Sequence, residues 1–171
     1  EDELVEEGNG FLRLRDSDGA VKFILGTEVS CIYSQGGQTR RVHLCLFFPD
    51  LASVKKFNAK LTGAGKNLRS DGRPILGMSA KQVLTIMKEI TPRSVMIPAH
   101  AWTPWFAVFG SKSGFDSLEE CFEELTPEIF AIETGLSSDP AMNWRLSALD
   151  KIALVSNSDA HSLPNLGREA N

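Results

Sequence analysis

The sequence predicts an α/β protein built on a parallel sheet of the barrel kind. Three observations support this prediction. From about residue 41 onward, apolar runs of strand length alternate with segments that carry helix-start signals, an order typical of parallel sheets with right-handed crossovers. The apolar runs are nearly continuous, as in strands covered on both faces. Polar residues interrupt or follow these runs, and in a barrel the carboxyl ends of the strands meet at the active-site mouth.

The strands are predicted from apolar runs bounded by turn residues. Residues 1–23 should form an irregular entry region with a hairpin, because Asp18-Gly19 lies between the apolar runs 11–15 and 21–23. The remainder of the chain, residues 24–171, should form the barrel portion. The strands expected within or next to it cover residues 23–29, 41–48, 94–100, 128–133 and 151–155.

Helices are expected where a capping residue precedes a segment with helical periodicity. Asp50 and Asp139 are favourable N-cap residues. Ser79 with Gln82 forms a capping-box pattern. The predicted helices cover residues 51–61, 80–90, 117–125 and 139–149. Residues 101–116 form a long aromatic loop, and loops of this length in compact domains are usually functional.

Five polar residues lie near or just after the ends of predicted strands. A His or Glu inside an apolar strand is costly unless it has a partner, and convergence on cations would satisfy all five together. Three His, one Glu and one Asp form a mixed nitrogen and oxygen set that suits zinc, manganese or iron, and not calcium. Taken singly, each residue also fits a hydrogen-bonded structural role. The candidate ligands are Glu28, His43, His100, Asp159 and His161.

Composition excludes several protein classes. The formal net charge is −4, no apolar stretch reaches the length of a membrane span, and the acidic N-terminus lacks the pattern of a signal peptide. The three cysteines lack Cys-x-x-Cys spacing, so free thiols in a reducing cytoplasm are the expected state. Because the chain starts without Met and stops abruptly, we expect both ends to be cuts in a longer protein.

Four short motifs carry a family resemblance. Gly26-Thr27-Glu28, Val42-His43, Pro98-Ala99-His100 and Ser158-Asp159-Ala160-His161, in this order, resemble the later motifs of the PHP (polymerase and histidinol phosphatase) superfamily. The flanking segments 100–106, 110–116, 133–140 and 166–169 resemble the PHP domain of the endonuclease Q family. This resemblance implies a distorted seven-stranded β/α barrel that holds up to three divalent metal ions and hydrolyses phosphate esters.

The resemblance also implies a role for each candidate ligand. Glu28 would bridge two metals, His43 and His100 would complete one of those two sites, Asp159 would bind the first metal, and His161 a third. The family opens with a His-x-His motif on its first strand, whereas this chain has no His before His43. We therefore expect residues 1–171 to be a truncated PHP domain that lacks its first strands, with catalysis depending on the absent ligands.

The function implied by the resemblance is cleavage of DNA at deaminated bases or abasic sites. Aromatic residues of the long loop could stack an unpaired base, or they could instead close the barrel mouth as a hydrophobic plug. Basic residues could meet backbone phosphates, or they could only form a solvated surface. The candidate substrate-binding residues are Trp102, Trp105, Phe106, Lys112, Glu133, Arg69 and Arg73.

Two other functions fit the same residues. One is a small-molecule phosphoesterase of the histidinol-phosphatase kind, which would use the same metals on phosphate monoesters. The other is a non-catalytic module that binds nucleic acid, and the missing His-x-His motif favours it for this segment. The long aromatic loop and the basic residues Lys66, Arg69 and Arg73 favour DNA as the partner.

Overall fold

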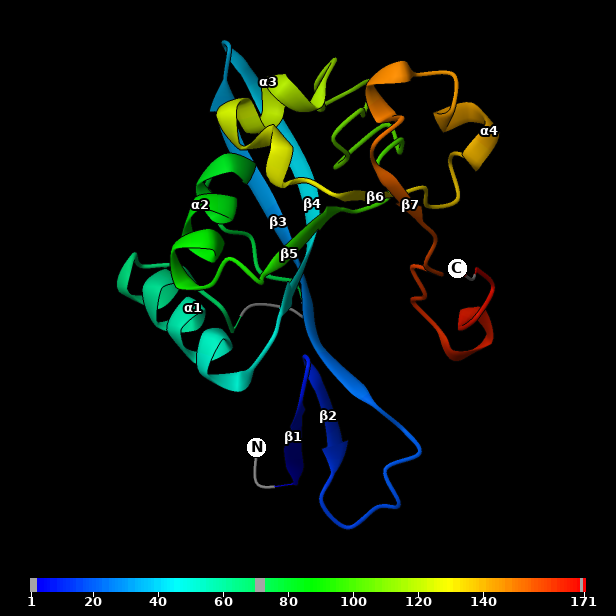
Figure 1. The fold of residues 1–171 in the computed structure, drawn as a ribbon. Helices are drawn as coiled ribbons and strands as arrows, with labels where there is room; N and C mark the ends of the chain where they lie inside the picture. The colour runs from blue at the N-terminus through cyan, green and yellow to red at the C-terminus, as the bar shows by residue number, and fades with distance from the viewer. Residues whose placement is uncertain (1–2, 70–72, 170) are drawn as a thin grey trace.

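The protein contains two β-sheets, with helices packed on one side of the larger sheet (Figure 1). The computed structural model describes residues 3–69, 73–169 and 171. The larger sheet has the strand order β1-β2-β3-β4-β5, and each neighbouring pair is antiparallel, whereas β6 and β7 form a small parallel sheet. The strands are β1 (Leu4–Gly8), β2 (Phe11–Leu14), β3 (Phe23–Gln35), β4 (Gln38–Phe48), β5 (Val95–Pro98), β6 (Ala131–Glu133) and β7 (Ala153–Val155).

The helices begin at the capping residues that the sequence indicates. Asp50 accepts a hydrogen bond from the Ser53 backbone N–H at 2.7 Å, and Ser79 forms the predicted capping box with Gln82. These side chains accept hydrogen bonds from backbone N–H groups that have no acceptor within the first turn of a helix. The helices are α1 (Leu51–Gly63), α2 (Ala80–Ile90), α3 (Leu118–Phe122) and α4 (Pro140–Asn143), with 3₁₀ helices η1 (Glu123–Glu128), η2 (Ser147–Leu149) and η3 (Leu163–Asn165). None of the helices in the described ranges is long and apolar enough to span a bilayer.

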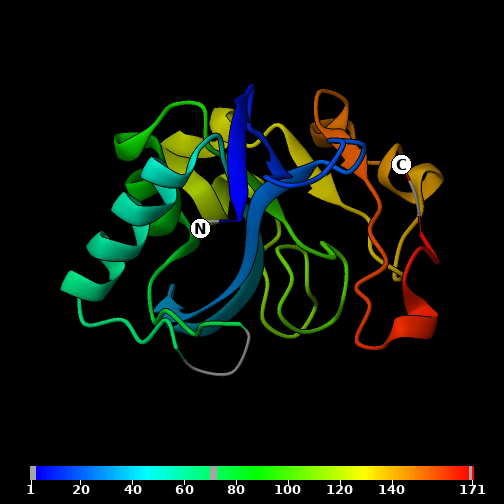
Figure 2. The ribbon, with the colours of Figure 1, turned by 90° about the horizontal axis from the view of Figure 1, so that it is seen from below.

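The main hydrophobic core fills the space between the larger sheet and helices α1 and α2. Val42, Leu44 and Leu46 of β4 are fully buried, and they belong to one apolar cluster with Phe57 of α1 and Met87 of α2. Figure 2 shows these helices on one side of β3 and β4 and the long loop after β5 on the other side. The second face of the sheet is therefore covered by loop rather than by helix.

The predicted parallel sheet is wrong for β3, β4 and β5. β4 and β5 are joined through two helices, and two successive helical passes return the chain to the end of the sheet at which it left. Val95 accordingly pairs with Phe47, so that β5 starts where β4 stops and runs in the opposite direction. Among the named strands of the described ranges, the parallel arrangement holds only for β6 and β7. The described strands form open sheets and not a closed barrel, so the structure shows a mixed α/β fold.

Two predicted helices are shorter than expected. Ser117 and Asp139 act as N-caps, accepting hydrogen bonds from the backbone N–H groups of Glu120 and Met142. However, α3 ends after one turn because Glu123 has a positive φ of 52°, and the chain continues as the 3₁₀ helix η1. Similarly, α4 stops at Asn143, and only the separate helix η2 follows before β7. A capping signal fixes where a helix begins, but it does not fix its length.

The N-terminal region forms two hairpins. β2 pairs with β3 through Phe11↔Ile24 and Leu12↔Phe23, which confirms the hairpin predicted around Asp18-Gly19. The hairpin between β1 and β2 was not predicted, although Asn9-Gly10 at its tip is a strong turn signal. Both residues have positive φ, as this type of turn requires.

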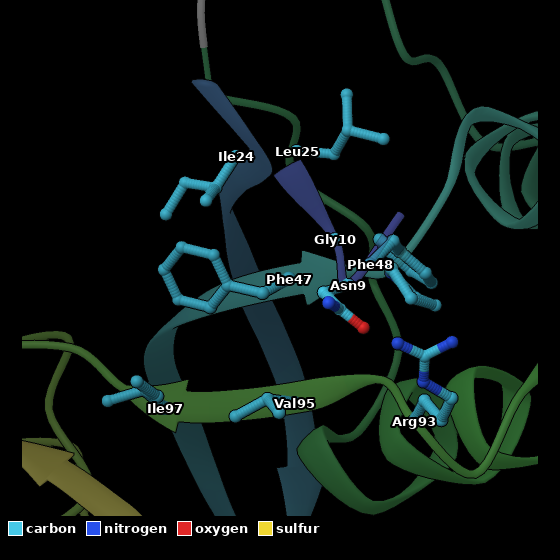
Figure 3. A pocket seen from close by; sticks show the side chains of 10 residues that line it. Asn9, Gly10, Ile24, Leu25, Phe47, Phe48, Arg93, Val95 and Ile97 are labelled. Carbon is cyan, nitrogen blue, oxygen red and sulfur yellow. The ribbon is translucent and has the colours of Figure 1, made fainter. Parts of the chain in front are cut away.

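A pocket of about 380 Å³ lies where this N-terminal region meets the end of the larger sheet (Figure 3). Its lining is mostly apolar and includes Ile24, Phe47, Val95 and Ile97, with Arg93 at one side. The lining contains no carboxylate or imidazole. The pocket therefore lacks the groups that bind metals or transfer protons.

The core predicts a clear difference between two leucine substitutions. Leu44→Ala should lower the free energy of unfolding by about 2–5 kcal/mol, because Leu44 is fully buried against α1 and α2 and its loss leaves a cavity. Leu163→Ala should change it by less than about 0.5 kcal/mol, because that side chain is 82% exposed. Urea denaturation of the two variants measures the difference, and equal effects would contradict the assigned core.

Candidate metal centre

Glu28 and His43 lie on the same face of the larger sheet because of the pairing between β3 and β4. Glu28 is opposite Cys45, and Ser30 is opposite His43. Paired residues of neighbouring strands project from the same face, and side chains alternate along each strand. Glu28 and His43 are therefore diagonal neighbours on the face away from the helices. The intervening residues Val29 and Leu44 point into the core.

His100 joins these two residues from the end of β5. Pro98 pairs with Leu44, and the backbone N–H of Ala99 donates to the carbonyl of His43 at 3.0 Å. This pairing delivers His100 beside His43 just after the strand stops. His100 has a positive φ of 34°, an uncommon conformation for a residue with a side chain.

The three side chains present one ligand atom each to a common point. His43 Nδ1 lies 3.1 Å from Glu28 Oε1 and 3.1 Å from His100 Nε2, and His100 Nε2 lies 3.8 Å from Glu28 Oε1. Ligands about 2.0–2.1 Å from a tetrahedral zinc ion are about 3.3 Å apart. The observed spacings bracket this value, so a divalent cation fits between these atoms with only small adjustments. All three atoms lie within 4.8 Å of one another.

Charge and burial set the protonation of the three groups. Burial by itself would raise the pKa of Glu28, but hydrogen bonds with His100 and His43 and the charge of Arg73 lower this pKa far below its ordinary value. Burial lowers the pKa of His43. Burial also acts to lower the pKa of His100, but its contact with Glu28 outweighs burial and raises this pKa. The cluster therefore contains a carboxylate and a neutral His43, which are both metal-binding forms.

Two further side chains lie at the cluster: Arg73, which was predicted as a substrate-binding residue, and Ser30, which was not identified from the sequence. Arg73 Nη1 lies 2.9 Å from Glu28 Oε1 and balances its charge. Ser30 is 3% exposed, and its hydroxyl has no hydrogen-bond partner among the described residues. Because Ser30 is directly opposite His43 in the sheet, this unused hydroxyl is on the face of the cluster. Buried hydroxyls usually have partners, so the face is suited to an additional polar ligand.

Glu133 supports the backbone around His100. It lies at the end of β6 and is 4% exposed. One carboxylate oxygen accepts a hydrogen bond from the His100 backbone N–H at 2.7 Å, and the other accepts from the Asn157 side chain at 2.7 Å. Gly135 follows, with a positive φ, and a Cβ there would lie 2.8 Å from His100 Cβ. Glu133 thus holds His100 in place, and the substrate contact predicted for it stays a prediction.

The aromatic residues of the long loop have different surroundings. Trp102 packs against Phe109 and donates its Nε1–H to Asn143 at 2.8 Å, so its ring is held by other parts of the chain. Phe106 stacks on the His43 ring, with centroids 4.5 Å apart. Trp105 is 51% exposed, with the Arg41 guanidinium 5.4 Å from its ring centre. Of the three predicted stacking residues, Trp105 is therefore the one most available to a ligand.

The remaining predicted residues lie outside the close cluster. Within the part of the chain that the structure describes, neither Asp159 nor His161 belongs to the metal-suited group. β7 ends at Val155, where the predicted strand also ends, and the His161 side chain is 75% exposed. Asp159 is nearer, because its charge helps to raise the pKa of His100. Lys112 and Arg69 are exposed on loops.

Comparisons with known proteins identify two curated relatives and two solved structures. No protein-family model matches the chain. It is 33% identical over 174 residues to the uncharacterized protein YqxK of Bacillus subtilis, which covers 98% of the chain and 43% of YqxK. A second uncharacterized protein, MJ0043 of Methanocaldococcus jannaschii, is 38% identical over 42% of the chain and 9% of its own length.

Two solved structures resemble the whole chain. The lesion-specific endonuclease PfuEndoQ from Pyrococcus furiosus is 32% identical with a TM-score of 0.77, over 98% of this chain and 38% of its own. Endonuclease Q in complex with a 27-mer duplex bearing an abasic lesion at the active site is 31% identical with a TM-score of 0.74, over 94% of this chain and 36% of its own. The chain thus spans about two fifths of the length of YqxK and of these endonucleases.

The close approach of Gly135 to His100 predicts an effect of Gly135→Ala. The new methyl group would displace His100, so the variant should lose about 1–3 kcal/mol more unfolding free energy than Gly37→Ala. Gly37 is a matched control, because it also has a positive φ but nothing lies within 4 Å of its would-be Cβ. Urea denaturation of both variants gives the comparison, and equal losses would mean that the contact with His100 is unimportant.

Proposed function

We propose that this chain belongs to a metal-dependent DNA endonuclease that acts at deaminated-base or abasic lesions. Residues 24–171 would supply the barrel portion of a PHP-type domain. The observation that carries the proposal is the convergence of Glu28, His43 and His100 in a chain whose fold follows endonuclease Q over nearly its whole length. Similarity of fold alone would not argue for chemistry, whereas these three ligand atoms do.

The donor set indicates the class of metal. Two imidazole nitrogens and one carboxylate oxygen suit zinc, with manganese or iron as alternatives. A bound divalent ion supplies Lewis-acid chemistry for phosphodiester hydrolysis. The Glu28 carboxylate would contribute a negative charge to the metal site, and Glu133 fixes the backbone of His100. Asp159 and His161 are proposed as ligands of further metals in the whole protein, where they would have to move toward the cluster.

DNA is the proposed substrate because of the groups at the edge of the cluster. The exposed ring of Trp105 can stack on an unpaired base. Arg73 contacts Glu28, and its side chain is 37% exposed, so its guanidinium can also meet a phosphate. Lys112 and Arg69 would add contacts to the DNA backbone. Trp102 and Phe106 would support the site from behind, since their rings already pack on Phe109 and His43.

The cysteines bear on the compartment in which the protein works. Cys31, Cys45 and Cys121 are free thiols, and Cys31 and Cys121 are buried. Burial raises the pKa of Cys31 to about 12, so this thiol stays protonated and unreactive. We propose a reducing compartment such as the cytoplasm because the described cysteines are all free thiols.

Metal binding provides the first test of this proposal. The purified chain should retain about one equivalent of zinc or manganese per molecule through Glu28, His43 and His100. Glu28→Gln and the double variant His43→Ala, His100→Ala should lose this metal while remaining folded. Glu119→Gln, which neutralises an exposed carboxylate on α3, should keep it. Elemental analysis together with circular dichroism checks the outcome, and a folded parent without metal would overturn the proposed centre.

DNA binding provides the second test. Trp105→Ala should weaken binding to a duplex with a single abasic site by about 5- to 150-fold, since stacking of one base on an aromatic ring contributes about 1–3 kcal/mol. The melting temperature should change little because the ring is half exposed. Trp144→Ala is the matched control, because Trp144 is 72% exposed and lies outside the loop. Fluorescence anisotropy measures the affinities.

The rival functions give different results in the same assays. A lower melting temperature with unchanged DNA affinity in Trp105→Ala would identify the loop as a plug. Hydrolysis of phosphate monoesters, without affinity for lesion DNA, would indicate a small-molecule phosphoesterase. DNA binding that survives complete metal removal, in a protein with no incision activity, would indicate a non-catalytic module.

A further inference from the structure

The His100 ring has a second polar contact that faces away from the cluster. Its Nε2 atom points to Glu28 and His43, whereas its Nδ1 atom lies 2.9 Å from the hydroxyl oxygen of Thr103. Thr103 belongs to the turn that immediately follows β5, and its own backbone N–H donates to the carbonyl of His100 at 3.0 Å. The site described above gives this hydroxyl no role.

The neighbours of the Thr103 hydroxyl determine where its hydrogen goes. The oxygen lies 2.9 Å from the carbonyl of Trp105 and 3.1 Å from the carbonyl of His100. Carbonyl oxygens can only accept, and a hydroxyl has a single hydrogen to donate. If that hydrogen pointed to His100 Nδ1, both carbonyls would face a bare oxygen at hydrogen-bond distance. The hydrogen therefore goes to a carbonyl, and the Thr103 oxygen accepts a hydrogen bond from His100 Nδ1–H.

This assignment fixes which nitrogen of His100 carries its proton. A neutral imidazole has one N–H and one lone pair. With the proton held on Nδ1 by Thr103, the lone pair lies on Nε2, which is the atom directed at Glu28 and His43. The opposite tautomer would place a hydrogen on Nε2, between His43 Nδ1 and Glu28 Oε1, where it would occupy the position of a cation.

We infer that Thr103 is a positioning residue that holds His100 with its proton on Nδ1, so that Nε2 is free to bind a divalent cation. The inference rests on the proposed metal centre. Glu133 and Gly135 fix only the backbone of His100. The torsion of the ring and the place of its proton depend on Thr103, and groups of this kind tune metal affinity. The same hydroxyl binds the Trp105 carbonyl, so one side chain links the ligand to the exposed stacking residue.

Two substitutions of Thr103 separate the hydroxyl from the volume of the side chain. Thr103→Val keeps the shape and removes the hydroxyl, whereas Thr103→Ser keeps the hydroxyl and removes a methyl group. The first measurement is long-range ¹H–¹⁵N correlation spectroscopy of the metal-free protein at alkaline pH, where the imidazoles are neutral. The second is titration with Zn²⁺ in competition with a chromophoric chelator. Thermal unfolding of both variants checks that they fold.

The expected result is an Nδ1–H tautomer at His100 in the parent and in Thr103→Ser, with some Nε2–H tautomer in Thr103→Val. Zinc affinity should fall by about 10- to 100-fold in Thr103→Val and recover in Thr103→Ser. A folded Thr103→Val protein with the parental tautomer and affinity would overturn the inference while leaving the metal centre intact. If the parent binds no zinc, the metal centre fails, and the spectra still decide the role of Thr103.

Discussion

A half-buried carboxylate sets the main constraint on this structure. Glu28 lies within a long strand, where a charge without partners would be destabilising. Two imidazoles and one guanidinium satisfy it, and each comes from a different element: His43 from β4, His100 from the end of β5, and Arg73 from the loop before α2. The pairing of β3, β4 and β5 therefore places the two imidazoles beside the Glu28 carboxylate and so compensates for its burial.

Two residues with strained backbone lie at the candidate centre. His100 and Phe106 are non-glycine residues with positive φ. Such conformations cost about 1–3 kcal/mol each and persist only where surrounding contacts hold them. His100 has that support from Glu133 and Thr103, and Phe106 from its stacking on His43. Backbone strain of this kind is typical of a functional site, because mutations readily remove strain that serves no function.

The sequence predicted the ligands better than it predicted the sheet that holds them. Glu28, His43 and His100 could be found because polar residues are conspicuous in apolar strands, and the structure brings them together. The direction of β5 could not be predicted, because capping signals at Asp50 and Ser79 locate two helices without indicating that two passes reverse the next strand. Asp159 and His161 were predicted from their motif, but the local chain after β7 does not bring them to the cluster. Arg73 was predicted as a DNA contact, but its ion pair with Glu28 could not be predicted. Ser30 and Thr103 carry no sequence signal, because Ser and Thr are common and their roles here depend on neighbours that only the fold brings together.

The alternation of side chains along β3 and β4 has an evolutionary consequence. Glu28 and His43 share a face only because the chain between them, which includes the hairpin turn, keeps its register. One residue inserted or deleted within either strand, between the ligand and the turn, would send one ligand toward α1 and α2. A change of two residues would restore the facing arrangement. Related proteins that keep this site should therefore vary the length of these strand segments in steps of two, or absorb an odd residue in a bulge or in the turn itself.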